Sequence, residues 1–236
     1  MNHYSNNLTS TRYVQKGPLD RFRAHPAGNV VLVFLLVLLL CSIVSLIYPD
    51  NFRFLSKPNL IILQRAIPTL GIMALGVGLL MIAGEFDLSV GAVFGLSAYI
   101  MAMVYTSGMP ILVGVVAALV VGIIIGLING WVTTSFGIPS FITTLGTLFI
   151  IRSGGRLVSD NVPIIFQVPG WFKTLMTGRV FGYLQMQFVW FVIIAIIAWI
   201  ILNRHTLGNH FFAVGGSKVS SLQVGINVKK TKIFAF

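Results

Sequence analysis

The chain has 236 residues, of which 56% are hydrophobic and only 9% are charged, whereas soluble domains carry about 25% charged residues. This composition excludes a soluble globular protein and indicates an integral membrane protein. The net charge of +11 would suggest a nucleic-acid partner in a soluble protein. Here the basic residues gather at the ends of apolar segments, where they orient the chain and contact lipid headgroups, so we expect membrane lipid and no nucleic acid as partners.

The apolar stretches predict an all-α, polytopic transmembrane helix bundle. About six of them approach the roughly 20 residues that a helix needs to cross the bilayer, and none alternates as a barrel strand does. The predicted segments cover residues 29–48, 59–83, 88–106, 110–134, 139–151 and 184–202. Pro68 and several glycines interrupt the second segment, which we therefore expect to be bent or broken. Gly122, Gly126 and Gly130 in the fourth segment predict a close helix–helix contact.

The distribution of Lys and Arg predicts how the chain is organised across the membrane. Residues 1–28 form a basic tail and residues 203–232 a loop without any acidic residue, so both are predicted to be cytoplasmic, with a transmembrane domain at residues 29–202 between them. The connection at residues 152–183 then lies outside, and its aromatic and proline content predicts a loop on the membrane interface. Residues 233–236 look like the start of a further span, so we expect the chain to be truncated at its C-terminus.

Two carboxylates interrupt the apolar sequence between the second and third segments, in the stretch GEFDLSVG at residues 84–91. A carboxylate at membrane depth costs about 2.5–3.5 kcal/mol, so such a residue normally faces a polar interior, a partner or an interface. We expect a break in the helix here, in which Asp87 caps the third segment by accepting from the N–H groups of residues 88–90. Ser89 is expected to assist, so that Glu85, Asp87, Ser89 and Gly91 form a structural hinge or cap.

Polar side chains on the fourth and fifth segments are candidates for a path through the membrane. Asn129, Thr143 and Thr144 could contact a polar solute there. The commoner alternative is that such groups bond a backbone carbonyl or a neighbouring helix.

The sequence contains little that would support catalysis. It has no HExxH pair, no G-x-S-x-G elbow and no G-x-x-x-x-G-K-[ST] phosphate loop. A single cysteine, Cys41, excludes an intrachain disulfide and a cysteine-based metal site. We therefore expect no enzymatic activity, no cofactor and no metal ion.

Three blocks of sequence, in order, carry a family resemblance. They are GEFDLSVGAVFGLSAY at residues 84–99, GLINGWVTTSFGIPSFITTLGTLFIIRSGGRLVSD at 126–160 and TLGNHFFAVGGSKVSSLQVGINVKKTKIF at 206–234. Together they resemble the membrane permease subunits of bacterial ATP-binding-cassette importers for ribose, xylose, arabinose and galactose. The chain departs from the usual pattern at Glu85, where a small or apolar residue is common, and at several positions of the last block.

The resemblance implies a permease subunit of the bacterial inner membrane that forms the path for a pentose or hexose sugar. It implies three partners: a cytoplasmic ATPase that hydrolyses the ATP, a periplasmic or tethered sugar-binding protein, and a second permease subunit, identical or homologous. The last block would contact the ATPase through one short helix at about residues 217–224, framed by glycines. The residues expected to shape this coupling loop are Gly208, Gly215, Gly216, Leu222 and Gly225.

Other functions remain open at this point. The cargo could be a nucleoside, an autoinducer-type sugar derivative or a branched-chain amino acid. A different class is a membrane scaffold fragment that folds and pairs but does not transport. An ion channel fits worse, because the sequence has neither a selectivity-filter motif nor a ring of charges.

Overall fold

The computed structural model describes residues 27–159, 162 and 164–236. The predicted basic tail, residues 1–28, lies almost entirely outside the described residues. The chain divides into two units, residues 1–60 and residues 61–236, which are described in turn.

The first unit contains helix α2 (Gly28–Ile47), which agrees with the first predicted segment. The helix ends where Tyr48 precedes a proline, and the Tyr48 carbonyl then accepts hydrogen bonds from the N–H groups of Asn51 and Phe52. The chain folds back from this turn, so that the N–H of Leu55 donates to Ser45 Oγ at 3.1 Å. This unit is thus one apolar helix followed by a short, hydrogen-bonded connection.

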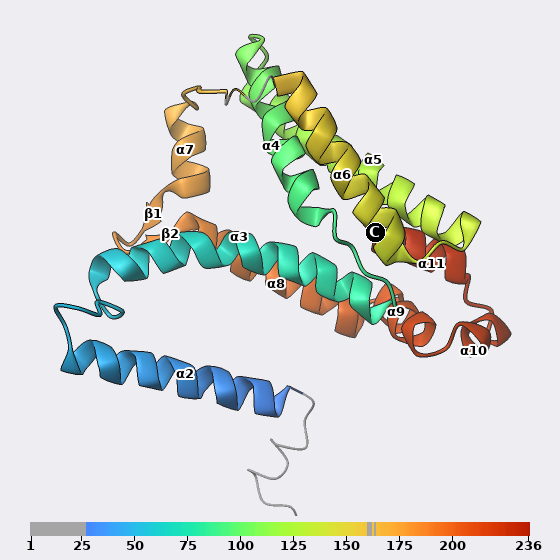
Figure 1. Cartoon of the computed structure of the whole chain (residues 1–236), viewed down its shortest axis with the longest axis horizontal. Helices are drawn as coiled ribbons and strands as arrows, with labels where there is room; N and C mark the ends of the chain where they lie inside the picture. The colour runs from blue at the N-terminus through green and yellow to red at the C-terminus, as the bar shows by residue number, and fades with distance from the viewer. Residues whose placement is uncertain (1–26, 160–161, 163) are drawn as a thin grey trace, which may run out of the picture. The chain divides into compact units, whose positions relative to one another are not determined.

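The second unit is almost entirely helical (Figure 1). Its helices follow the bounds α3 (Lys57–Ile82, beginning in the first unit), α4 (Val90–Thr106), α5 (Ile111–Phe136), α6 (Ser140–Ser159), α7 (Gly170–Thr177), α8 (Met186–Arg204), α9 (Thr206–Gly216), α10 (Lys218–Gln223) and α11 (Val228–Ala235). Strands β1 (Arg179–Val180) and β2 (Leu184–Gln185) form a short antiparallel hairpin.

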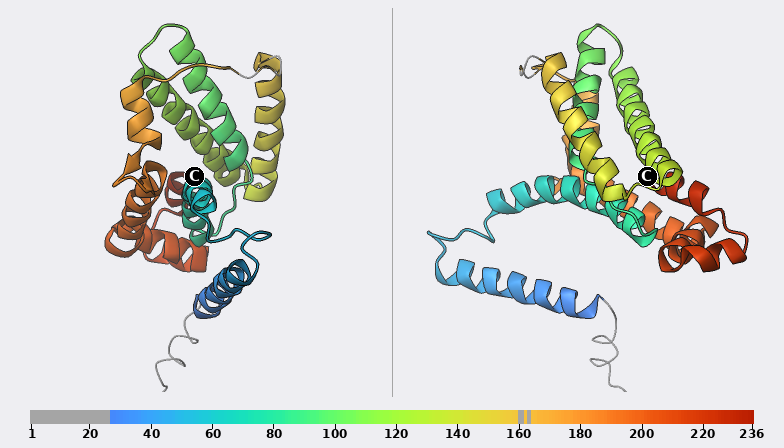
Figure 2. Two further views of the ribbon diagram at one scale, coloured as in Figure 1. Left: turned by 90° about the vertical axis from the view of Figure 1, so that its left-hand side faces the viewer. Right: turned by 45° about the vertical axis from the view of Figure 1, so that its right-hand side comes forward.

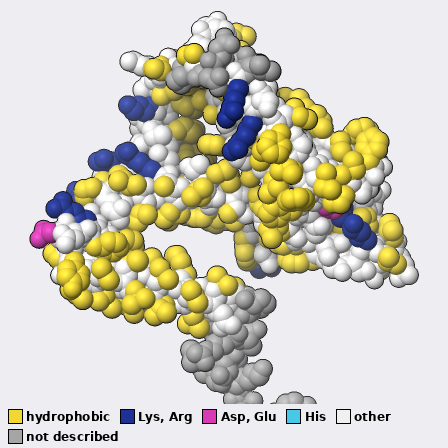
Figure 3. Space-filling view, viewed as in Figure 1, with side chains coloured by type: hydrophobic (Ala, Val, Ile, Leu, Met, Phe, Trp, Pro, Cys, Tyr) yellow, Lys and Arg dark blue, Asp and Glu magenta, His cyan; other side chains and the backbone are white. Residues whose placement is uncertain are grey.

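The all-α, polytopic fold predicted from composition is confirmed. Four of the described helices, α2, α3, α5 and α8, are long and apolar enough to cross a membrane, and α4 is a shorter apolar helix. Large hydrophobic side chains stay exposed along these helices, and they cover much of the surface drawn in Figure 3. Lipid can solvate such a surface, whereas water would not.

The structure differs from two expectations about local structure. Of the bend or break expected in α3, the break is absent, because the helix continues through the buried Pro68 to Ile82. The connection expected at residues 152–183 is not a plain loop either. Helix α6 occupies its beginning as far as Ser159, and α7 and the hairpin occupy its end.

The hairpin after α7 is attached to α3 by a buried glutamine. Its turn places Phe181 and Gly182 at positive φ, which suits a tight hairpin turn. Gln185 is fully buried. Its N–H donates to Gln64 Oε1 at 3.1 Å, and its Oε1 accepts from Arg65 Nε at 3.2 Å. The segment between α6 and α8 is therefore fixed by hydrogen bonds at its end.

Helices α4, α5 and α6 pack against one another, and α11 packs against both α5 and α9 (Figures 1 and 2). Three connections thereby meet at one end of the unit: residues 83–89 between α3 and α4, residues 137–139 between α5 and α6, and the α9–α10 region. The candidate functional site lies at this end.

Candidate functional site at the break between α3 and α4

The predicted break in the chain is present at residues 83–89. Helix α3 is terminated by Gly84, which has φ +79°. The N–H of Glu85 donates to the Leu80 carbonyl at 3.1 Å, and the N–H of Gly84 donates to the Met81 carbonyl at 3.0 Å. This pair of bonds is the Schellman helix ending, which favours glycine because the residue adopts the left-handed conformation. The glycine thus turns the chain out of the helix just before the two carboxylates.

Helix α6 supplies the hydrogen-bond acceptors that the irregular segment needs. The N–H of Phe86 donates to Ser140 Oγ at 3.0 Å, and the N–H of Leu88 donates to Thr144 Oγ1 at 3.1 Å. The two hydroxyls are four residues apart on one face of α6, and they meet N–H groups two residues apart in the irregular segment. Backbone donors that would be costly to leave unpaired inside a membrane protein are satisfied in this way.

A second set of bonds runs in one direction from α6 to Asp87. Thr147 Oγ1 donates to Asn129 Oδ1 at 2.6 Å, Asn129 Nδ2 donates to Ser89 Oγ at 3.1 Å, and Ser89 Oγ donates to Asp87 Oδ1 at 2.6 Å. Asn129 and Ser89 are both fully buried. The chain of donors ends on a carboxylate, which also accepts from the N–H of Ser89 at 2.6 Å. A hydrogen bond to a charged acceptor is stronger than a neutral one, so this arrangement fixes the start of α4.

These contacts show which hydrogen bonds are made by the predicted cap, Asp87, and by the candidate path residues Asn129, Thr143 and Thr144. Asp87 accepts from Ser89 alone among residues 88–90, because the Leu88 N–H goes to Thr144. Asn129 and Thr144 are fully buried, and the side chain of each makes hydrogen bonds that hold the break. Thr143 differs from its neighbour, because its buried Oγ1 has no hydrogen-bond partner among the described residues.

Gly91 lies apart from these bonds, on the first turn of α4. A Cβ at Gly91 would meet no atom within 4 Å. With Gly95 and Gly155 it lines a pocket of about 320 Å³, which Arg152 and Arg156 of α6 also line. The small residue therefore leaves space between α4 and α6.

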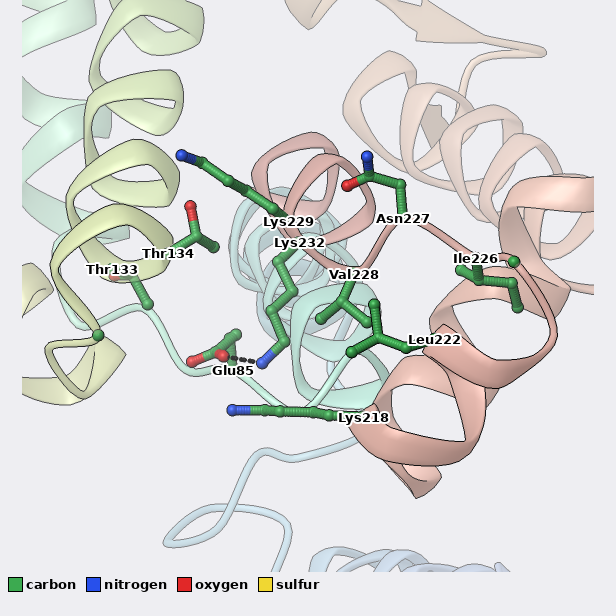
Figure 4. Close-up of a pocket in the computed structure, with 12 residues that line it drawn as sticks. Glu85, Thr133, Thr134, Lys218, Leu222, Ile226, Asn227, Val228, Lys229 and Lys232 are labelled. Carbon is green, nitrogen blue, oxygen red and sulfur yellow. Dashed lines mark hydrogen bonds and ion pairs between the residues drawn. The ribbon is translucent and has the colours of Figure 1, made fainter.

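Glu85 has a partner that sequence reasoning missed, the ammonium group of Lys232 in α11 (Figure 4). The side chains are 9% and 4% exposed, respectively. Burial lowers the pKa of Lys232 below its ordinary value, while the hydrogen bond and charge of Glu85 act in the opposite direction. The sequence did contain a signal for this ion pair, namely the unusual acidic residue Glu85, because a buried carboxylate needs a cation as its partner.

Three of the four glycines of the predicted coupling loop lie in a helix, and only Gly225 lies in a turn as expected. The predicted short helix is present as α10, but the residues before it form another helix, α9, and do not form a loop. Gly208 and Gly215 lie within α9, and Gly216 is its last residue. Gly225, at φ +80°, follows α10 as expected of a turn residue. Leu222 lies on α10 and is 61% exposed.

Gly215 makes a close backbone contact between α9 and the end of α3. A Cβ at Gly215 would clash with the Ile82 carbonyl oxygen, and a Cβ at Gly84 would lie 3.4 Å from Gly215 Cα. Helix α11 approaches α5 in the same manner, since a Cβ at Gly130 would lie 2.9 Å from Ile233 Cα. The predicted glycine contact on α5 is thus with α11 at Gly126 and Gly130.

The three blocks that carry the resemblance therefore meet in space. The break in the first block is hydrogen-bonded by the second block and ion-paired to the third.

A comparison with family models matches residues 59–236 to a family described as "Branched-chain amino acid transport system / permease component". The chain belongs to this permease family.

Curated relatives support the assignment to the family. The chain is 30% identical over 206 residues to a protein from Haemophilus influenzae named ribose import permease protein RbsC, covering 86% of this chain and 62% of the relative. It is 28% identical over 184 residues to the autoinducer 2 import system permease protein LsrC of Escherichia coli O9:H4, covering 78% and 53%. The chain thus spans about half to three-fifths of the length of these relatives. The comparison with solved structures found no significant match.

Family and fold together make the chain a multi-pass inner-membrane protein of a transport family. The matching family is described as the permease component of a transport system.

Proposed function

We propose that the chain is the transmembrane permease subunit of an ATP-driven importer for a pentose or hexose sugar. The sugar would cross the membrane without chemical change, and ATP would be hydrolysed by a cytoplasmic partner. A periplasmic or tethered binding protein would deliver the sugar, and a second permease subunit, identical or homologous, would complete the path. The observation that carries the proposal is the contact of all three family blocks at the 83–89 break.

Helix α10 supports the role of the last block as the contact for the ATPase. Val219, Leu222 and Val224, on and just after α10, are 68%, 61% and 72% exposed. Exposed apolar side chains on a short helix in a basic region favour burial against a partner. Helix α10 is connected to α11, which pairs with Glu85, and to α9, which contacts Gly84. A movement of α10 would therefore be transmitted to the break through these two helices.

The names of the relatives favour a sugar as cargo. One is named as a ribose permease and another as an autoinducer 2 permease. The description of the matching family keeps a branched-chain amino acid as an alternative cargo. The second name keeps an autoinducer-type sugar derivative as an alternative cargo. A nucleoside and a scaffold without transport activity are the remaining alternatives.

Sugar-dependent ATP hydrolysis tests the proposal. The full chain is reconstituted with the ATPase and binding protein encoded beside it, and hydrolysis is measured against a panel of pentoses, hexoses, nucleosides, autoinducer 2 and branched-chain amino acids. Stimulation by one pentose or hexose supports the proposal, whereas stimulation by another class reassigns the cargo. Absence of any stimulation while the partners remain bound would favour the scaffold.

Leu222→Asp tests the proposed ATPase contact in the same assay. Leu222 is exposed, so the substitution leaves the fold intact but places a charge where an apolar contact is proposed. Sugar stimulation should be lost while the chain remains folded. Lys230→Asp, on an exposed position of α11, is the control for adding negative charge in this region.

A further inference from the structure

A pocket of about 450 Å³ lies between α3 and α4, next to the break. Its volume is within the range of about 300–1,000 Å³ that is typical of small-molecule sites. Its lining residues come from α3, the break, α4, α5 and the end of α11, and none of them comes from α6. The hydrogen bonds by which α6 fixes the break therefore do not account for this space.

Asp87 is the single polar side chain among the residues that line this pocket. The others are Gly76 and apolar residues, among them Met73, Val77 and Phe94, whose side chain is 52% exposed. Ligand sites in proteins commonly combine such an apolar lining with a small number of polar groups that fix the orientation of the ligand. An ionisable residue among membrane helices is itself a sign of function.

One oxygen of the Asp87 carboxylate is available to a ligand. Oδ1 accepts from the N–H and from the Oγ of Ser89, both at 2.6 Å, whereas Oδ2 has no hydrogen-bond partner among the described residues. The Asp87 side chain is only half-buried, and Oδ2 is accessible, in contrast to the buried Oγ1 of Thr143. A carboxylate oxygen in apolar surroundings costs free energy unless it accepts a hydrogen bond. A ligand hydroxyl in the pocket can donate that bond.

The charge of the pocket narrows the class of ligand. No lysine, arginine or histidine belongs to its described lining. Asp87 would repel an anionic ligand, and the carboxylate of an α-amino acid would find no cation to pair with. The pocket suits a neutral molecule whose hydroxyls donate to Asp87 and whose C–H groups pack against apolar side chains such as Phe94. A sugar ring has both properties.

From these features we infer that the transported sugar contacts the permease in this pocket, where a sugar hydroxyl donates to Asp87 Oδ2. The inference rests on the proposed function, which supplies the sugar as cargo. A hydrogen bond to a charged acceptor is stronger than a neutral one, but the apolar lining offers no partner to the other hydroxyls. The pocket should therefore bind the sugar weakly, as suits a site that the cargo has to leave again.

Saturation-transfer NMR, which detects weak binding, tests the inference with the purified full chain in neutral detergent. D-ribose, D-xylose and D-galactose are titrated separately, and choline and L-valine serve as a cationic and an amino-acid probe. We expect saturation transfer to at least one of the sugars and less transfer to the other two probes. Stronger transfer to choline or L-valine than to every sugar would assign the pocket to another class of ligand and overturn the inference.

A pair of glycine variants decides whether the sugar occupies this pocket. Gly76→Leu adds a large side chain to the lining, and a Cβ at Gly76 would meet no atom within 4 Å. The substitution should fill the pocket without a clash and abolish the transfer. Gly78→Leu is the matched control, because a Cβ at Gly78 also meets no atom within 4 Å and Gly78 does not line the pocket. It should bind as the unaltered chain does.

A second pair of variants separates contact with the sugar from support of the break. Asp87→Asn keeps the shape of the side chain and removes the charge, so it should weaken sugar binding about tenfold. Thr144→Val removes the acceptor of the Leu88 N–H but leaves the bonds of Asp87 in place, so it should change binding little. Equal weakening by the two substitutions would show that Asp87 acts only through the break.

Failure of the inference can be distinguished from failure of the proposed function. The inference is overturned, while the proposed function stands, if a sugar that stimulates ATP hydrolysis shows no saturation transfer. The same holds if Asp87→Asn or Gly76→Leu binds that sugar as the unaltered chain does. If no sugar stimulates hydrolysis, the proposed function fails and the inference fails with it.

Discussion

The two carboxylates of the break lie two residues apart, yet the regions around them are built differently. Asp87 is held by uncharged donors, which continue through Ser89 and Asn129 into α6. Glu85 is held by one lysine from α11, beside a pocket with further lysines. A set of hydrogen bonds can lose one member and keep the rest, whereas a buried ion pair that loses one member leaves an unpaired charge. Each substitution around Asp87 should therefore lower the free energy of unfolding by a small amount, whereas breaking the Glu85 ion pair should lower it by a large amount at once.

Breaking the ion pair should give the largest effect on stability. Lys232→Met removes the lysine that is paired with the buried Glu85 carboxylate, and breaking a buried pair in this way should cost up to about 3–5 kcal/mol. Combining it with Glu85→Gln removes both charges and should recover most of the loss. Thermal unfolding of the two single variants and the double variant measures the coupling. If the double variant is as unstable as Lys232→Met, the pair does not make the energetic contribution assigned to it.

The glycine contact between α9 and α3 should give the next largest effect. Gly215→Ala forces the new Cβ against the Ile82 carbonyl, and such overpacking costs about 1–3 kcal/mol. Gly216→Ala is the matched control, because a Cβ there meets no atom within 4 Å. Chemical unfolding of both variants under one condition makes the comparison. Equal losses in the two variants would show that the backbones of α9 and α3 do not approach as closely as described.

On the Asp87 side, two adjacent threonines should behave differently. Thr144→Val removes the acceptor of the Leu88 N–H and should cost about 1–3 kcal/mol. Thr143→Val has the same change in shape, but the Thr143 hydroxyl has no partner among the described residues, so the substitution should be neutral or slightly stabilising. The unfolding temperatures of the two variants measure this difference in stability. A loss for Thr143→Val as large as that for Thr144→Val would contradict the assigned hydrogen bonds.

The sequence predicted those features that depend on composition and local pattern. Apolar length located the membrane helices, and two carboxylates in an apolar context located the break. It could not separate Thr143 from Thr144, because adjacent residues on a helix point in directions about 100° apart and only the packing of α6 decides which one meets the break.

Contacts between distant parts of the chain could not be predicted in the same way. Lys232 was assigned to the loop at residues 203–232, and its pairing with Glu85 joins residues 147 positions apart. Helix α9 was missed because its glycines are typical of turns, whereas Gly215 allows a close approach to α3. Glycine identity alone does not distinguish a turn from a close helix contact.

Exchanging the charges of the ion pair tests most directly the claim that Glu85 and Lys232 link the break to the proposed coupling region. Sugar-stimulated ATP hydrolysis of the reconstituted transporter is measured for Glu85→Lys, for Lys232→Glu and for the two substitutions together. Each single variant places like charges against each other and should lose the stimulation, while the exchanged pair restores attraction and should regain a substantial part of it. Single variants that keep full stimulation would contradict the link between the break and α11, as would an exchanged pair that is no more active than the singles.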